Sequence, residues 1–214
     1  MMRRTGWSLK PFRPPLSRIA GILLGFLTLG SLSIQNYAQA NDPITSSGLN
    51  TQVDLSATSS AGMVHYDITG GTRPGGGNNL FHSFGDFNVP TNSVANFLNE
   101  TGLPTSNILG RVTGGNISNI FGTIQTSNFG NANLFLVNPA GFLFGAGAQL
   151  NVGGIVTFTT ADYIRFTDNI HFNSVAGPAD LPLTAAPIAA FGFLGPNAAS
   201  IAIQGGTLEV SDSS

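Results

Sequence analysis

The most constraining feature of this sequence is a stretch of short apolar runs, residues 132–154, in which tight turns separate each run from the next. The runs are Leu134–Val137, Phe142–Phe144 and Leu150–Val152. Runs of this length are too short for helices and suit short strands. Turn-forming residues separate or end them, namely Asn138-Pro139, Gly141, Gly145, Gly147 and Gly153-Gly154. The chain therefore bends every few residues, which suits either a meander of hairpins or a coil of stacked rungs.

Weak self-similarity favours the coil. Three segments repeat an apolar-x-apolar strand bracketed by Gly or Asn, namely Gly122–Gln125, Ala148–Val152 and Ile201–Val210. A β-solenoid leaves this trace because each rung stacks on its neighbour. Abundant Gly, Asn, Thr and Ser, together with 16 Phe, also favour strands and turns over helices. We therefore predict that residues 41–214 are almost wholly β.

Short strands are also expected on both sides of this stretch. The candidates are Thr51–Leu55, Met63–Thr69, Asn79–Val89, Ser93–Leu98, Asn107–Gly115, Ile117–Ile124 and Ile155–Phe166. Within Asn79–Val89, the apolar residues Phe81, Phe84, Phe87 and Val89 are expected in the core. Two segments are expected to be loops. Gly70–Gly77 is too rich in Gly to hold one conformation unaided, and the four prolines in residues 175–200 indicate an irregular excursion.

The first 40 residues have the pattern of a secretory signal peptide. The early charges are all positive and precede an uncharged, mainly apolar run of 16 residues, Ile19–Ile34, which is followed by an A-x-A site at Ala38-Gln39-Ala40. A membrane anchor is the alternative, but the run is shorter than the roughly 20 residues that span a bilayer. We predict export by the general secretory route, with cleavage after Ala40.

The charge that remains after this cleavage limits the partners. Residues 41–214 keep three arginines (Arg73, Arg111 and Arg165), no lysine and all ten Asp and Glu, which gives a net charge of −7. Nucleic acid and anionic lipid both require clustered Lys and Arg. The composition therefore argues against both as partners.

Cysteine is absent, although an exported protein is able to form disulfides. One explanation is that a sizeable β core needs no cross-links. The other is that the chain crosses a second barrier unfolded, where a disulfide-closed loop would obstruct threading. The absence alone leaves both explanations open.

Residues that could carry chemistry are scattered. His65, His82 and His171 lack the spacing of zinc ligands. The Gly70–Gly77 loop lacks the Lys and the following helix of a phosphate cradle. The aspartates form no calcium loop, and they are Asp54, Asp67, Asp86, Asp162 and Asp168. We therefore predict no cofactor and no metal. A β-helix enzyme that cleaves polysaccharide is the serious alternative to a non-catalytic domain, but it would need grouped carboxylates or a basic residue at a site.

An ordered series of short motifs covers about residues 79–162. The motifs are Asn79–Phe84, Arg111–Gly115, Ser118, Ile120, Gly122, Ile124, Ala132–Gly141, Phe144-Gly145, Ala148, Leu150, Val152–Gly154 and Thr159–Asp162. In this order they resemble the N-terminal secretion domain of two-partner secretion exoproteins, the filamentous haemagglutinin type or haemagglutination-activity domain. The Asn-Pro-Asn-Gly-Ile motif of that family appears here as Asn138–Phe142, NPAGF. Its Asn-Pro-Asn-Leu motif has no counterpart, as in variants that lack it.

The resemblance implies an all-β fold, a right-handed parallel β-helix with an N-terminal cap and extra-helical hairpins. It also implies that an outer-membrane transporter barrel recognises the domain through periplasmic polypeptide-transport-associated domains. The product would be secreted or displayed on the surface of a Gram-negative-type bacterium. The domain, residues 41–214, would target secretion and nucleate the folding of a large adhesin-like or haemagglutinin-like exoprotein. A β-helix carbohydrate-active enzyme or a polysaccharide-binding module is the alternative.

The end of the sequence adds one expectation. The chain stops at Ser214, just after a strand-like segment, and nothing there resembles the polar cap of a solenoid. We therefore expect these residues to be the N-terminal part of a longer exoprotein. Its C-terminal part would then supply any binding to host-cell or surface glycans.

Two groups of residues form the candidate site. Asn138, Pro139 and Gly141 are a secretion or turn motif, which we expect to set the register of the following rung and to act in secretion through that structure. For Arg111 two interpretations remain, namely a partner for a nearby Asp and a part of the docking surface. The candidates for transporter docking or for the cap are Asn79, Phe81, His82, Phe84, Arg111, Thr113, Gly114 and Gly115.

Overall fold

The computed structural model of the protein describes residues 43–56, 62–177, 182–196, 198–205 and 208–211. These residues belong to one compact unit, Pro43–Ser214. The predicted signal peptide and its cleavage site at Ala38 and Ala40 lie outside the described residues, so that prediction stays untested. Within the described ranges, no helix has the length and apolar character needed to cross a membrane.

The described unit is built from short strands, which confirms the all-β prediction. Its single helical element is a 3₁₀ turn, η1 (Pro74–Gly76), and Arg73 beside it donates to the Pro104 carbonyl oxygen and to Thr105. The strands are β1 (Ile44–Gly48), β2 (Thr51–Ser56), β3 (Val64–Gly70), β4 (Asn79–Phe87), β5 (Ser93–Leu98), β6 (Asn107–Val112), β7 (Ser118–Ile120), β8 (Thr123–Ser127), β9 (Asn133–Val137), β10 (Phe142–Phe144), β11 (Gln149–Asn151), β12 (Val156–Thr159), β13 (Tyr163–Phe166), β14 (His171–Asn173), β15 (Ile188–Gly192), β16 (Ile201–Ile203) and β17 (Glu209–Ser211).

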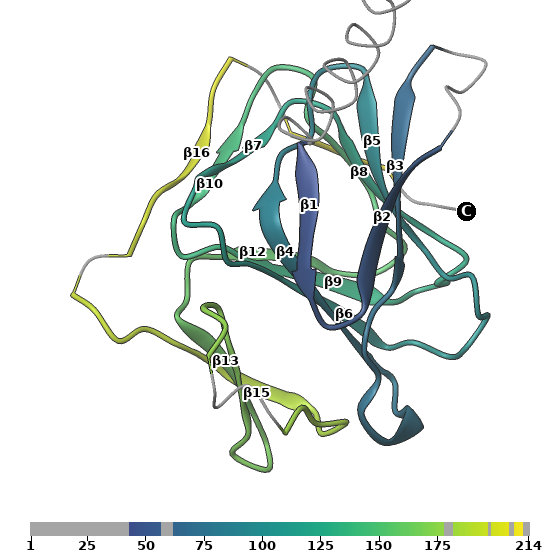
Figure 1. Ribbon diagram of the computed structural model, residues 1–214. Coiled ribbons are helices and arrows are strands. Elements are labelled where there is room, and N and C mark those ends of the chain that lie inside the picture. Colours follow the sequence, from purple (N-terminus) through teal and green to yellow (C-terminus); the bar gives the residue numbers. More distant parts are fainter. Residues whose placement is uncertain (1–42, 57–61, 178–181, 197, 206–207, 212–214) are drawn as a thin grey trace, which may run out of the picture. The chain divides into compact units, whose positions relative to one another are not determined.

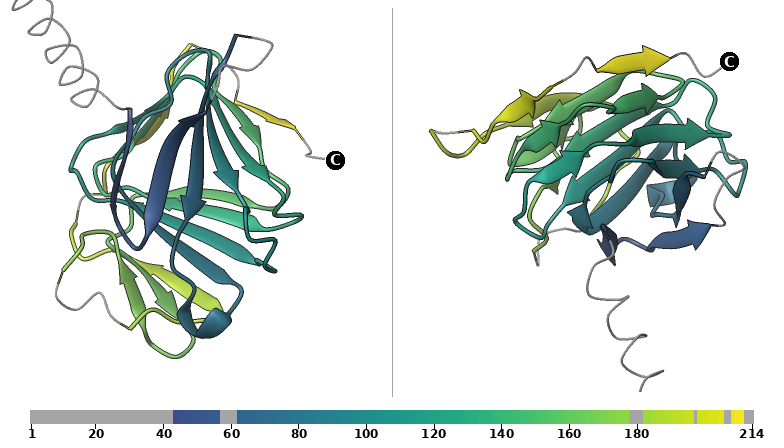
Figure 2. Two further views of the ribbon diagram at one scale, coloured as in Figure 1. Left: turned by 45° about the vertical axis from the view of Figure 1, so that its right-hand side comes forward. Right: turned by 90° about the horizontal axis from the view of Figure 1, so that it is seen from above.

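The strands form a right-handed parallel β-helix, in which three sheets surround one interior (Figure 1). Sheet A has the order β1-β4-β6-β9-β12, sheet B the order β17-β11-β8-β5-β3-β2, and sheet C the order β16-β10-β7. Each rung passes from sheet A through sheet C to sheet B, as in β6, β7 and β8, and the next rung repeats the path in β9, β10 and β11. Successive rungs pair in parallel and in register, which the view from above shows as a stack (Figure 2). The predicted coil of short rungs is therefore confirmed, and the hairpin meander is wrong for the central stretch.

The N-terminal cap consists of β1 and β2, which run against the direction of the rungs. β1 pairs antiparallel with β4, and β2 pairs antiparallel with β3. A tight turn joins them at Leu49 and Asn50, both at φ 54°. Ile44 on β1 is 2% exposed and belongs to the interior core, so the cap closes the first rung against water.

The interior core is filled by side chains that alternate inward along each strand. On sheet A these include Phe84, Ile108 and Leu136, all 0% exposed. Gly110 lies opposite Leu136 and makes room for it, because a Cβ at Gly110 would lie 2.7 Å from Leu136 Cδ2. Phe87 and Val89 are also buried here, as predicted. Alternation along strands that are buried on both faces thus directs every second residue into this core.

A second, outer core lies on the other face of sheet A. There β13 pairs antiparallel with both β14 and β15 to form an extra-helical sheet, sheet D, which confirms the predicted extra-helical hairpins. Phe81 is buried, as predicted, but it belongs to this outer core and not to the interior. The members of the outer core are Phe81, Leu109, Val137, Ile164, Phe166 and Phe172.

Residues 175–200 differ from the irregular excursion that the sequence predicts, because they contain β15. Pro182, Pro187 and Pro196 flank this strand and leave Ile188–Gly192 free of proline, so the strand is able to pair with β13. Its pairing partner, β13, lies more than twenty residues earlier in the chain, so no local sequence pattern predicts the pairing.

Candidate functional site

The turn at Asn138–Gly141 joins β9 to β10 and is tied to the rungs on both sides. The Asn138 side chain is 0% exposed, and its Nδ2 donates to the Asn116 carbonyl oxygen and to Ser118 Oγ, both at 2.9 Å. Its Oδ1 accepts from the Ala140 backbone N–H at 2.9 Å, which closes the turn. The Asn138 amide therefore holds the previous rung in place, and its side chain offers no surface to a partner.

Gly141 occupies a position that other residues fill only with strain. Its φ is 109°, and a Cβ there would lie 2.6 Å from the Ser200 carbonyl oxygen. The Gly141 carbonyl oxygen accepts from the Ser118 backbone N–H at 3.1 Å. The turn thus packs between the rung before it and the strand that follows at β16. This is the geometry expected of a register-setting turn, and its role in secretion stays a prediction.

Arg111 is a buried hub that connects sheet A to sheet D. It is 3% exposed, Nε donates to Ser83 Oγ at 2.9 Å, and Nη1 donates to the Asn173 carbonyl oxygen at 3.0 Å. The guanidinium also lies 5.2 Å from the centre of the Phe172 ring, within the range of a cation–π contact. A guanidinium with these contacts acts as a tie between strands, and little of it is open to a docking partner.

The hydroxyls around Arg111 extend this tie to the cap. Ser83 Oγ lies 2.8 Å from Ser47 Oγ on β1, and Thr113 Oγ1 lies 3.0 Å from the same Ser47 oxygen. Thr113 also donates to the Phe84 carbonyl oxygen at 2.9 Å. The Arg111–Thr113 motif therefore fastens the cap strand, the first two rungs and β14 to one another.

His82 faces the interior core as a neutral imidazole. It is 1% exposed, its ring centre lies 5.7 Å from that of Phe97, and its Nδ1 has no hydrogen-bond partner in the described structure. Burial, with a smaller contribution from the charge of Arg73, lowers the pKa of His82 to about 3. Among the described residues, no group of three or more His, Asp, Glu or Cys could hold a metal ion.

Asn79 begins a ladder of side-chain amides along sheet A. Asn107 Nδ2 donates to Asn79 Oδ1 at 2.9 Å, and Asn133 Nδ2 donates to Asn107 Oδ1 at 3.1 Å. The ladder ends where the Ile155 backbone N–H donates to Asn133 Oδ1 at 2.9 Å. Asn79 itself donates to the carbonyl oxygens of Thr184 and Ala186, at 3.1 and 2.9 Å. Sequence reasoning missed this ladder, although the recurrence of Asn at the first position of β4, β6 and β9 is its signal.

The remaining candidates lie at the surface. Thr113 is half-buried, while Gly114 and Gly115 are exposed, and Gly115 lines an open hollow of about 600 Å³. Gly114 donates to the Gly85 carbonyl oxygen at 2.7 Å, and a Cβ on Gly114 would lie 2.3 Å from that oxygen. Of the predicted docking residues, the structure therefore brings only Thr113–Gly115 to solvent. The other five are buried, because alternate positions of β4 and β6 face one core or the other.

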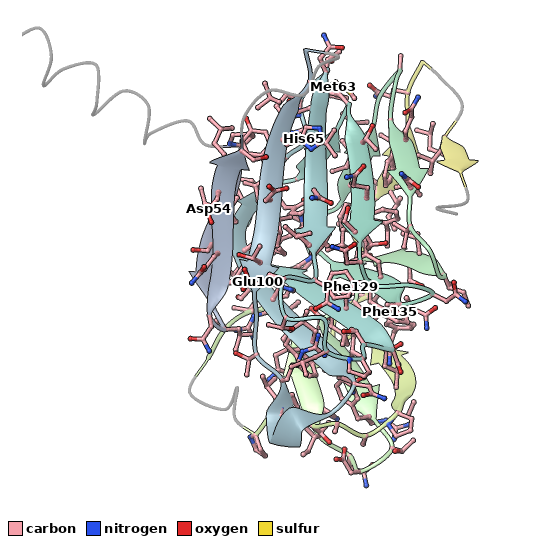
Figure 3. The ribbon with its side chains drawn as sticks, turned by 90° about the vertical axis from the view of Figure 1, so that its right-hand side faces the viewer. Asp54, Met63, His65, Glu100, Phe129 and Phe135 are labelled. Carbon is pink, nitrogen blue, oxygen red and sulfur yellow. The ribbon has the colours of Figure 1, made fainter. Side chains whose placement is uncertain are left out.

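A polar face covers the outside of sheet B, which is turned to the viewer in Figure 3. Asn96 Nδ2 donates to Asp67 Oδ1 at 2.7 Å, and Gln125 Nε2 donates to Asn96 Oδ1 at 3.0 Å. Asp54 lies opposite Asp67 across β2 and β3. These side chains bond to one another from rung to rung, which makes this row a second amide ladder.

Comparison with known proteins agrees with this architecture. A family model described as "TPS secretion domain" matches residues 40–213. No curated protein matches the chain significantly. The family match covers the whole β-helix, its cap and sheet D, and extends well beyond the motifs at residues 79–162. The chain therefore belongs to the TPS secretion domain family of two-partner secretion.

Proposed function

We propose that this domain is recognised by an outer-membrane transporter barrel, through the periplasmic polypeptide-transport-associated domains of that transporter, and that it nucleates the folding of an adhesin-like or haemagglutinin-like exoprotein. Family membership gives the domain a secretion-targeting role in a protein that a Gram-negative bacterium exports through an outer-membrane transporter. The role requires binding and folding and no catalysis.

The observation that carries the docking part is the free edge of β15. In the described structure β15 pairs with β13 on one side only, so the other side presents unpaired backbone N–H and C=O groups. The segment Ile188–Leu194 has no charge, and it exposes Phe191 (38%), Phe193 (53%) and Leu194 (80%). An edge of this kind supports docking by strand addition, in which backbone hydrogen bonds supply affinity and apolar side chains supply specificity.

The distribution of charge supports the same mode of binding. Arg111 is buried, and the Arg73 guanidinium is engaged by Pro104 and Thr105. The Arg165 guanidinium donates to Asn169 on the neighbouring turn. Because these guanidiniums are engaged, attraction to an anionic surface contributes little. The segment Ile188–Leu194 is itself uncharged, so we expect the affinity for the transporter to depend only weakly on salt.

The test places a charge at Phe193, the first residue after β15, and compares it with the same charge on another edge strand. Phe193→Lys should lower secretion at least fivefold, because a lysine ammonium would be desolvated when a strand is added there. Leu55→Lys is the matched control, since Leu55 is 70% exposed on β2, the edge strand of sheet B. The measurement is the amount of protein in the medium and in the periplasm after co-expression with the cognate transporter. Equal secretion of the two variants would reject the β15 edge as the docking surface.

A further inference from the structure

The first rungs of the β-helix are tied to sheet D by two long-range contacts. Asn79 donates from β4 to the carbonyl oxygens of Thr184 and Ala186, more than a hundred residues later in the chain. Arg111 donates from β6 to the Asn173 carbonyl oxygen at the end of β14. Both side chains are 3% exposed. Two polar groups of the earliest rungs thus bond to acceptors in a segment that the ribosome makes 62 to 107 residues later.

The local path around Thr184 is shaped to receive Asn79. Thr184 Oγ1 accepts from the Ala186 backbone N–H at 3.0 Å and donates to Asp168 Oδ2 at 2.5 Å. This arrangement turns the carbonyl oxygens of Thr184 and Ala186 toward one Asn79 Nδ2. The hydrogen bond from Thr184 is also the main cause that lowers the pKa of Asp168, so the carboxylate stays ionised.

Close packing reinforces the same junction. A Cβ on Gly77 would lie 2.4 Å from Ala185 Cβ, so the chain at Ala185 passes directly over the residues that lead into β4. Beneath sheet D, Phe81 and Leu109 are both 0% exposed. Without sheet D these two side chains would face water, and without the segment Leu183–Ala186 that leads into β15 the Asn79 amide would lose both acceptors. The outer face of sheet A is therefore incomplete until β15, which ends at residue 192, is in place.

The interior core has no such dependence. From β3 to β12 its rungs pair with neighbours 22 to 29 residues away, as at Leu80–Ile108, Ile108–Leu134 and Leu134–Val156. Contacts at shorter sequence separation close smaller loops, which lowers the entropy cost of forming them. The rungs are therefore able to stack before sheet D is available.

We propose that sheet D, together with Leu183–Ala186, is a latch that closes on the rungs after they have stacked. Its closure depends on the hydrogen bonds that Asn79 donates to Thr184 and Ala186. An open latch leaves the outer face of sheet A uncovered until residue 192, the end of β15, has been delivered. Closure then locks the cap, the first rungs and sheet D together. The timing during export rests on the proposed secretion function. The latch itself is a property of the chain and is tested without a transporter.

Tyrosines make the order of folding observable. After removal of residues 1–40 the chain has no Trp and two Tyr, Tyr66 on β3 of the β-helix and Tyr163 on β13 of the latch. Tyr163 stacks on His171 at 4.2 Å between ring centres, so its fluorescence reports on sheet D. Tyr66→Phe leaves a latch reporter, and Tyr163→Phe leaves a β-helix reporter. In refolding of residues 41–214 from denaturant, we expect the Tyr163 signal to develop at least fivefold more slowly than the Tyr66 signal. Coincident kinetics would overturn the order.

The role of Asn79 in closing the latch is tested by two matched variants in the amide ladder, Asn79→Asp and Asn107→Asp. Asn79→Asp keeps the shape of the side chain and its acceptor for Asn107, but it replaces the donor to Thr184 and Ala186 with a carboxylate oxygen. Asn107→Asp removes the bond that Asn107 donates to Asn79 Oδ1 and leaves both acceptors of Asn79, at Thr184 and Ala186, in place. Amide hydrogen exchange in β13 and β15 should be at least tenfold faster in Asn79→Asp than in the wild type, and less than threefold faster in Asn107→Asp.

Two results would overturn the latch. One is equal acceleration of β13 and β15 in both variants, and the other is uniform acceleration over the whole domain in Asn79→Asp. If Asn79→Asp fails to fold, Thr184→Val tests the same junction, because it removes the bonds to Asp168 and Ala186 and leaves the ladder intact. The same selective acceleration of β13 and β15 is expected there, and its absence would reject the proposal.

Discussion

The two cores of this domain are built from the same types of apolar side chain, but they join different parts of the chain. The interior core joins residues of adjacent rungs, and every rung contributes to it through Phe, Leu and Ile at alternate positions. The outer core joins the opposite face of sheet A to a separate small sheet that the chain reaches only later. Phe84 and Phe81 illustrate the difference, since both lie on β4 and both are 0% exposed, yet they face different partners. Equal burial therefore does not imply an equal role in folding.

The comparison of the two cores shows that one sheet, sheet A, contributes to both of them, one through each of its faces. Sheet A carries apolar side chains on both faces, as strands that are covered on both sides usually do, and its outer face adds the amide ladder and Arg111. The interior face is covered by the coil itself, whereas the outer face depends on β13, β14 and β15. Stability of the β-helix is therefore distributed over many rungs, while stability of the outer face is concentrated in one sheet and in the ties from Asn79 and Arg111.

The largest effect is expected where the interior rungs are joined. Asn138→Ala combined with Gly141→Val removes the bonds to Asn116 and Ser118 and forces a Cβ to 2.6 Å from the Ser200 carbonyl oxygen. A strained φ and buried groups without partners together should cost about 5 kcal/mol or more of unfolding free energy. We expect secretion to stop while the signal peptide is still cleaved. Co-expression with the transporter and assay of the medium decides this, and unchanged secretion would contradict it.

Truncation in the interior core should come next. Phe84→Ala removes a ring that packs against Phe87 at 5.0 Å between centres, and it should lower the unfolding free energy by about 3–5 kcal/mol. Denaturant unfolding should show one transition at a lower midpoint, because the rungs unfold together. Two separate transitions would argue that the interior core is not a single cooperative unit.

Truncation in the outer core should have a smaller global effect. Phe81→Ala removes contacts with Phe166 and Phe172, which lie 5.8 and 5.0 Å away between ring centres. We expect a loss of about 2–3 kcal/mol that appears mainly as local opening of sheet D, since the rungs keep their own core. Hydrogen exchange in β13 and β15 should rise more than in β8 and β9. The same loss in all four strands would show that the two cores are one.

The smallest effect is expected from acid. Because the folded pKa of His82 is about 3 and its ordinary value is 6.5, the unfolded chain binds the proton more readily between these values. Stability is therefore full above pH 6.5 and falls as the pH drops toward 3. At pH 5 the loss should be about 2 kcal/mol, from about 1.4 kcal/mol per pH unit. Denaturant unfolding at pH 7 and pH 5 measures it, and His82→Leu should remove most of this difference. A wild-type stability that is flat over this window would contradict the burial argument.

Much of the fold was accessible from local patterns. The short apolar runs and the turn residues predicted the rungs of residues 132–154, and the strands at β2, β3, β5 and β9 lie close to the predicted ranges. Pro139 and Gly141 marked a turn because their conformational preferences act within a few residues. The candidate site was harder to predict. The motif residues were found, but most of them are buried, and the exposed edge of β15 lies in a segment expected to be irregular.

The sequence by itself determined what depends on near neighbours, namely the all-β character, the short rungs, the tight corners and the anionic, lysine-free composition of residues 41–214. The tertiary structure alone decided which face of sheet A each side chain occupies, so that Phe84 entered the interior while Phe81 met Phe166 and Phe172. It also decided that Arg111 would meet Ser83, Asn173 and an aromatic ring, and that Asn79 would bond to Thr184 and Ala186. The physical reason is that alternation of side chains along a strand predicts which residues share a face, but it does not predict which segment packs on that face. For Asn79, Phe81 and Arg111 the cover comes from segments 62 to 107 residues away. The approach of these segments depends on the whole coil and leaves no periodic pattern in the chain.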